Sequence, residues 1–281
     1  AATLTSSVRS GTETNLLPLA MAAGQLALAL SVLLLAVPLQ AVTLRTSTKE
    51  CSCMNWKDAY TTHRVKCGSG YELNNFGVKM LPVAQSFMPS GLYDEFCTRF
   101  YQRISFNSCF NLRFGTLPQQ WCYTSAACSE AQKVPNTDVA VKNCSSGDDF
   151  MRTKVPEELN RLAAVDNLEI GLFGKMSYAM DPMKWSEVEG ASDLPAGLMA
   201  KAHTMEFLYG LKWAGPKAAT KTATQKVKET VESGVTTVFD ADNGHGGGTL
   251  IAKSKIYGFL PLEGKKTLGY VCMSDHGKPC Q

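Results

Sequence analysis

The sequence predicts a single N-terminal transmembrane helix followed by an α+β soluble part, in which a small disulfide-rich module precedes a mixed helix/strand region. Three observations lead to this fold class. One long apolar stretch lies near the N-terminus, most of the cysteines lie between residues 51 and 144, and helix-type and strand-type patterns follow residue 150. They divide the 281 residues into a tail at 1–14, an anchor at 15–44, the module at 45–150 and the mixed region at 151–281.

The anchor is predicted from Asn15 to Leu44, a stretch without a charged residue. About 20 helical residues cross the hydrocarbon layer of a bilayer, and Leu19–Val37 alone supplies nearly that many. A cleaved secretory signal peptide with its apolar core at Leu26–Val37 is the alternative. A chain that begins Ala-Ala without Met is what removal of an upstream presequence would leave. We therefore expect the apolar stretch to be retained as an anchor.

One face of the expected anchor helix carries small side chains at spacings of three and four residues, namely Ala20, Gly24, Ala27 and Ser31. Such a seam lets another transmembrane helix approach closely. Gln25 lies beside the seam, and an amide in the hydrocarbon layer needs a partner. That partner could be a neighbouring helix or the magnesium of a chlorophyll. The alternative is that alanine is simply common in apolar helices and that Gln25 lies near the interface.

The ten cysteines predict disulfides, because their density between residues 51 and 144 is that of a disulfide-stapled domain. Eight cysteines allow many connectivities, so the pairing inside the module stays open. Two more form a separate C-terminal couple that we expect to bridge across a short loop. Zinc ribbons need paired C-x₂-C knuckles, which the sequence lacks, so we expect no metal site and an oxidising compartment. The cysteines are Cys51, Cys53, Cys67, Cys97, Cys109, Cys122, Cys128, Cys144, Cys272 and Cys280.

Inside the module, clustered aromatic side chains are expected to form the core. Leu92, Phe96, Phe100 and Ile104 have helical spacing, which predicts a helix over 92–104 that carries the cysteine at position 97. Loops and short strands are expected elsewhere in the module.

The region 151–281 begins with a predicted helix, because Pro156 suits the first helical turn and the two acidic residues after it suit the positive end of the helix dipole. Further helices are expected over about 198–213 and 217–232. Strands are expected at 235–239, 249–256 and 267–272. Residues 240–244 resemble the opening of a calcium loop, but the glycine falls at the fifth place instead of the sixth and Ile251 stands in place of the closing glutamate, so we interpret them as a hairpin loop.

Composition excludes several classes of function. The net charge of +3 is spread evenly along the chain, so a nucleic-acid-binding face has no support. The four histidines are scattered, and the sequence contains no P-loop, no G-x-S-x-G, no H-E-x-x-H and no dinucleotide fingerprint. We therefore expect a protein without catalytic residues.

Two resemblances are carried by the module. The segment Asn107–Asn111 with Gln120–Thr124 resembles the heart of a kringle over about 20 residues. The longer set of Glu95–Arg103, Asn107–Cys109 and Gln120–Cys128, together with the anchor, resembles the cysteine-rich domains of many plastid proteins of dinoflagellate algae. Membrane-anchored members of that kind occur as accessory subunits of photosystem I bound to its chlorophyll–peridinin antenna.

The second resemblance implies a non-catalytic accessory or linker subunit of a thylakoid photosystem I–light-harvesting supercomplex. Its partners would be the photosystem core, the light-harvesting antenna subunits and membrane lipid. No cofactor is required, and chlorophyll a or carotenoid could lie at the anchor. The alternative is a secretory or cell-surface single-pass protein with a kringle-like ligand-binding module.

We expect residues 46–281 on the lumenal side. The charges flanking the anchor, Arg9 at one end and Arg45 and Lys49 at the other, mildly favour the opposite orientation. The paired cysteines outweigh them, since disulfides would not persist in a reducing stroma.

Overall fold

The computed structural model describes residues 49–74, 90–191, 221–241, 247–263 and 267–280. The expected anchor at 15–44, with its seam residues and Gln25, lies outside these ranges, as does the helix expected over about 198–213. Within the described ranges, no helix combines the length and the apolarity needed to cross a membrane. Residues 47–281 form one compact unit that contains both helices and strands, an α+β fold.

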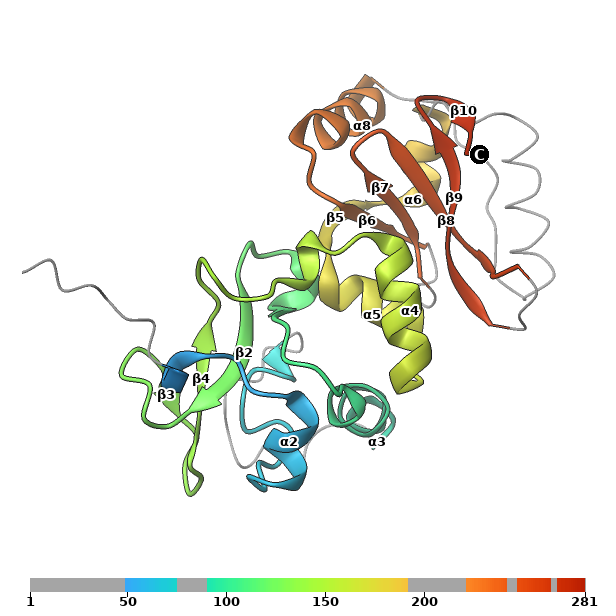
Figure 1. Ribbon diagram of the computed structural model, residues 1–281. Coiled ribbons are helices and arrows are strands. Elements are labelled where there is room, and N and C mark those ends of the chain that lie inside the picture. The colour runs from blue at the N-terminus through green and yellow to red at the C-terminus, as the bar shows by residue number, and fades with distance from the viewer. Residues whose placement is uncertain (1–48, 75–89, 192–220, 242–246, 264–266, 281) are drawn as a thin grey trace, which may run out of the picture. The chain divides into compact units, whose positions relative to one another are not determined.

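The first half of this unit contains a four-stranded antiparallel sheet of order β1-β2-β4-β3 and several short helices (Figure 1). Its core is aromatic: the fully buried ring of Trp56 lies 4.9 Å from that of Tyr101 and 4.8 Å from that of Trp121. The elements are η1 (Lys49–Cys51), α2 (Trp56–Thr61), α3 (Ser90–Tyr93), η4 (Asp94–Thr98), η5 (Tyr101–Arg103), β1 (Phe110–Asn111), η6 (Arg113–Gly115), β2 (Gln120–Ser125), β3 (Gln132–Lys133), β4 (Val139–Asn143) and η7 (Met151–Thr153).

All ten cysteines are paired, which confirms the prediction of disulfides. Four bridges lie within the module and join residues 30 to 77 positions apart in the sequence. Bridges across such long loops remove much conformational freedom from the unfolded chain. The pairs are Cys51–Cys128, Cys53–Cys122, Cys67–Cys97, Cys109–Cys144 and, at the C-terminus, Cys272–Cys280.

The prediction of a single helix over 92–104 is wrong. The chain forms three short helical elements there: α3, the π-helical η4 and the 3₁₀ turn η5. Phe96 and its neighbour Cys97 are both buried, and so are Phe100 and the residue after it. These four positions span about 140° of a helical wheel, so their burial alone is compatible with one face of an α-helix. The backbone of Phe100 leaves the helical region, with φ −122° and ψ −88°, which separates η4 from η5.

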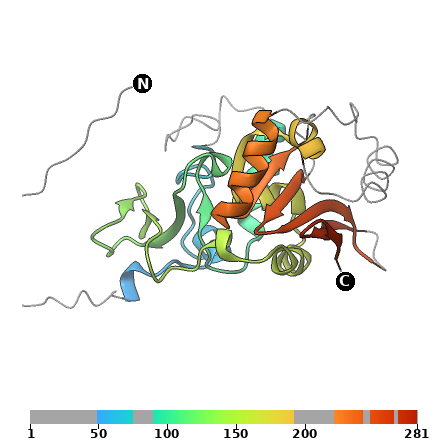
Figure 2. The ribbon, with the colours of Figure 1, turned by 90° about the horizontal axis from the view of Figure 1, so that it is seen from above.

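The second half is built on a six-stranded sheet of order β10-β9-β8-β7-β6-β5, in which only the β5–β6 pair is parallel. Helices α4 and α5 contact one face of the sheet, and α6 and α8 contact the other (Figure 2). The elements are α4 (Pro156–Asp166), α5 (Ile170–Ser177), β5 (Ala179–Lys184), α6 (Trp185–Val188), η8 (Glu189–Ala191), α8 (Lys221–Ser233), β6 (Thr237–Asp240), β7 (Thr249–Ala252), β8 (Lys255–Pro261), β9 (Leu268–Asp275) and β10 (Lys278–Pro279).

Several expectations for this half are confirmed. A helix begins at Pro156, α8 covers the described part of the polar helix, and β6 and β9 lie where strands were predicted. The strand expected over 249–256 is instead the hairpin β7–β8, because the chain reverses at Lys253, which has a φ of 57°. No glycine or asparagine marks this turn in the sequence, so local residue preferences gave no signal for it. Helix α5 and strand β5 were not predicted.

One hydrophobic cluster contains side chains from both halves. The ring of Phe173 on α5 lies 6.0 Å from the ring of Phe100 and 6.0 Å from that of Phe110. Asn111 Nδ2 donates hydrogen bonds to the backbone oxygens of Lys175 (3.1 Å) and Tyr178 (2.5 Å). The module and the mixed region are therefore joined by a shared core.

Candidate functional site

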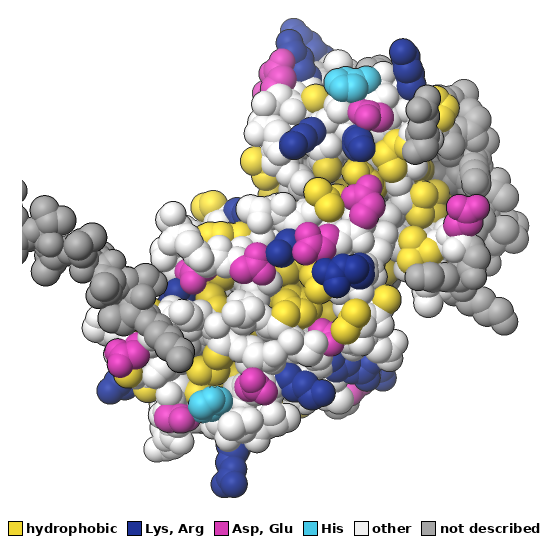
Figure 3. Space-filling model, in the orientation of Figure 1, with side chains coloured by type: hydrophobic (Ala, Val, Ile, Leu, Met, Phe, Trp, Pro, Cys, Tyr) yellow, Lys and Arg dark blue, Asp and Glu magenta, His cyan; other side chains and the backbone are white. Residues whose placement is uncertain are grey.

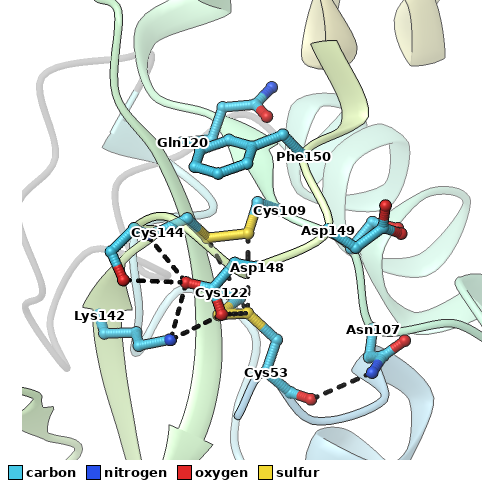
Figure 4. Close-up of a disulfide and its surroundings, with 12 residues drawn as sticks. Cys53, Asn107, Cys109, Gln120, Cys122, Lys142, Cys144, Asp148, Asp149 and Phe150 are labelled. Carbon is cyan, nitrogen blue, oxygen red and sulfur yellow. Dashed lines mark hydrogen bonds and ion pairs between the residues drawn. A yellow bond between two sulfur atoms is a disulfide. The ribbon is translucent and has the colours of Figure 1, made fainter. Parts of the chain in front are cut away.

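Two disulfides lie against each other beside the four-stranded sheet (Figure 4). The sulfur atom of Cys53 is 3.6 Å from that of Cys109 and 3.9 Å from that of Cys144, and the fourth sulfur belongs to Cys122 on β2. All four sulfur atoms lie within 4.8 Å of one another. The bridges join the segment before α2, the residue before β1, strand β2 and the residue after β4.

A partly buried ion pair lies beside this sulfur cluster. Both carboxylate oxygens of Asp148 lie 2.8 Å from Lys142 Nζ, and the Lys142 and Asp148 side chains are 10% and 11% exposed. Asp148 also accepts a hydrogen bond from the backbone N–H of Ser145, so the turn after β4 is held against the bridges. Cys109 and Cys122 are fully buried. Since thiol–disulfide exchange requires an accessible sulfur, this enclosure favours a structural role.

The four sulfur atoms are also the group with metal-site geometry within the described ranges. A metal binds cysteine as the thiolate. With both pairs bonded as disulfides, the cluster offers no thiolate in this state.

Glu72 is a fully buried carboxyl group inside the aromatic core. Its oxygens accept hydrogen bonds from the hydroxyls of Tyr60 (3.0 Å) and Tyr123 (2.5 Å) and from the backbone N–H of Gly70 (3.0 Å). Burial raises the pKa of Glu72, and the hydrogen bonds from the tyrosines and Gly70 oppose that shift only in part. The carboxyl thus ties the 70–72 segment to α2 and β2 through hydrogen bonds.

The substitution Glu72→Gln should make unfolding less dependent on pH. Because the folded-state pKa of Glu72 is raised, its contribution to stability is fully present below the unfolded value and is lost as pH rises through the folded value. The wild type should therefore lose stability relative to the variant as pH rises above about 4.5. Urea unfolding across this pH range checks it, with Glu263→Gln, an exposed carboxyl, as control. A parallel pH dependence of the two proteins would contradict the assignment.

A second buried charge cluster lies where β6 ends. Asp240 accepts hydrogen bonds from Lys175 Nζ (2.7 Å) and Lys184 Nζ (3.0 Å). Burial alone would raise the pKa of Asp240, but the hydrogen bonds and charges of the two lysines hold it below its usual value. Asp240 opens the segment that resembles a calcium loop, yet its carboxylate is already neutralised by lysines. The segment joins antiparallel strands β6 and β7, as a hairpin loop does.

A pocket of about 400 Å³ lies in the disulfide-rich half, close to η6 and β3. The described residues that line it carry one cation, three amides, one phenol and two leucines, and none of them is acidic: Tyr71, Asn74, Leu112, Arg113, Leu117, Gln132 and Asn143. Tyr71 donates a hydrogen bond to Gln132 Oε1 (3.1 Å) across the pocket wall. The arrangement can bind a polar ligand that also has an apolar part.

The surface drawn in Figure 3 shows lysines, arginines and acidic side chains interspersed, without a field of one sign. Exposed ion pairs such as Arg99 with Asp94 (2.6 Å) also join charges of opposite sign. Mixed charge of this kind does not steer a strongly charged partner onto the face.

The predicted site residues have different outcomes. The structure describes and pairs the ten cysteines, whereas the seam Ala20, Gly24, Ala27 and Ser31 and the candidate pigment ligand Gln25 lie outside the described residues. The Glu72 cluster and the pocket were not predicted, because their members come from segments far apart in the sequence. Comparison with protein-family models, curated proteins and solved structures finds no match to this chain.

Proposed function

We propose that this chain is a non-catalytic accessory or linker subunit of a thylakoid photosystem I–light-harvesting supercomplex. It would brace the photosystem core and the antenna through the anchor at 15–44 and through residues 46–281 in the lumen. The observation that carries this proposal is the pairing of all ten cysteines. Disulfides of this density form and persist in an oxidising compartment.

The character of the buried polar groups supports a bracing role. Glu72 is held by two tyrosines, Asp240 is held by two lysines, and one cysteine of each central disulfide is fully buried. These groups make their hydrogen bonds and ion pairs with other residues of the same chain. A stiff, cross-linked body attached to a membrane anchor can fix the distance between two neighbouring subunits.

The second candidate is a secretory or cell-surface protein whose kringle-like module binds a ligand. One observation favours it: the pocket in the disulfide-rich half. Asn143, which begins an N-x-S glycosylation sequon, is exposed at the end of β4 and lines that pocket.

Protease treatment of thylakoid membranes tests the proposal. Protease added to intact thylakoids should spare residues 46–281 and digest them after the membranes are opened, and the chain should migrate with photosystem I and antenna chlorophyll. Digestion in intact membranes, or migration apart from chlorophyll, would contradict the proposal. A glycan on Asn143 in the purified protein would favour the secretory candidate instead.

A further inference from the structure

The turn η6 has an unusual backbone. Arg113, Phe114 and Gly115 all have positive φ values, of 50°, 51° and 70°. Residues with a side chain rarely adopt this left-handed conformation, and two in succession are rarer still. A single positive φ also occurs in the hairpin turn at Lys253, but η6 has three in succession.

Two of the three residues are explained by packing. A Cβ atom on Gly115 would lie 2.1 Å from the backbone oxygen of Tyr178, so only glycine fits there. The ring of Phe114 packs edge-on against the ring of Phe96 at 5.6 Å. The side chain of Asn111, bonded to the backbone of residues 175 and 178, holds the strand that leads into the turn. The fold thus requires the turn and these two residues.

Arg113 has no such explanation. Its side chain is exposed, and it makes no hydrogen bond or ion pair with any residue in the described ranges. Asparagine or glycine would adopt the left-handed conformation with less strain. The same side chain lines the pocket. A strained position occupied by an arginine that has no hydrogen bond or ion pair within the described ranges points to a ligand.

The neighbourhood of the pocket favours an anion. Among the residues that the structure describes, no aspartate or glutamate lines it, and its amides come from Asn74, Gln132 and Asn143. A second guanidinium, that of Arg152, contacts the loop 112–117. It donates hydrogen bonds to Asn111 Oδ1 (2.9 Å) and to the backbone oxygen of Leu117 (3.4 Å). Arg152 has no carboxylate partner within the described ranges. Arg113 within the loop 112–117 and Arg152 beside it therefore both lack an acidic partner among the described residues.

We propose that this pocket binds a small organic carboxylate with a short apolar or aromatic body. Arg113 would pair with the carboxylate, because its planar guanidinium matches two carboxylate oxygens. The side chains of Leu112, Leu117 and Tyr71 would contact the apolar body, and a volume of about 400 Å³ suits a ligand of this size. This activity is independent of the proposed linker role.

The proposal is tested by ligand-observed NMR on the full-length chain in detergent, with 3-phenylpropionate as probe and its neutral amide as matched comparison. The acid should bind and the amide should bind about tenfold more weakly or not at all. The variant Arg113→Asn should lose about tenfold or more in affinity for the acid, while its thermal midpoint stays equal to or rises above that of the wild type. Arg113→Lys should retain part of the binding.

The control is Arg161→Asn, which removes an exposed arginine on α4 outside the pocket lining. It should leave affinity for the acid unchanged. Three results would overturn the proposal: no binding of the acid at millimolar concentration, equal binding of acid and amide, or full binding by Arg113→Asn. A large loss of thermal stability in Arg113→Asn would also overturn it, because Arg113 would then serve the fold.

Discussion

Replacing Cys109 and Cys144 together by alanine should destabilise the protein by about 2–5 kcal/mol. The bridge spans 35 residues, Cys109 is fully buried, and its sulfur lies 3.6 Å from the neighbouring bridge. The variant loses both the constraint on the unfolded chain and the packing between the two bridges. Urea unfolding under non-reducing conditions, followed by circular dichroism, measures the loss.

The matched control is the replacement of Cys272 and Cys280 by alanine. That bridge spans only 8 residues, and both cysteines are partly exposed. Chain entropy alone makes its loss about 1 kcal/mol smaller than that of the 35-residue bridge. If the two double variants lose equal stability, the central sulfur cluster does not have the role assigned to it.

The substitution Asp240→Ala should cost about 3–5 kcal/mol, because it removes one partner of a buried ion pair. The side chain of Lys175 is 9% exposed, and its Nζ lies 2.7 Å from Asp240. Lys184, at 39% exposed, can reach water and should suffer less. Thermal and urea unfolding at pH 7 measure the effect.

Two further variants show whether the cost comes from the broken ion pair. Adding Lys175→Met to Asp240→Ala should recover most of the lost stability, since no buried charge remains on α5. Breaking the exposed pair of Lys228 and Glu232 on α8 should cost less than about 1 kcal/mol. A loss below about 1 kcal/mol for Asp240→Ala itself would show that this buried pair contributes little.

Local sequence patterns were sufficient for several elements of the fold. Pro156 and the acidic residues after it act within one helical turn, so the start of α4 could be predicted without the rest of the chain. The hairpin turn at Lys253 depends instead on the pairing of β8 with β7 and β9, which no local pattern contains. The helix expected over 92–104 breaks at Phe100, whose backbone leaves the helical region although the buried positions around it keep a helical period.

The candidate sites, like the hairpin turn, depend on features that local sequence patterns do not contain. Glu72 interacts with Tyr123, which lies 51 residues away, and the strain at Arg113 is a backbone property that side-chain chemistry does not reveal. Neither could be predicted from residue types and spacing.

By itself, the amino-acid sequence determined that the cysteines form disulfides, that the chain has α+β content and that a helix begins at Pro156, because cysteine density and short-range periodicity are local properties. Only the tertiary structure decided which cysteines pair, where the 92–104 helix breaks and which side chains surround Glu72 and Arg113. Those outcomes depend on contacts between residues tens of positions apart, and such contacts exist only once the shared core has formed.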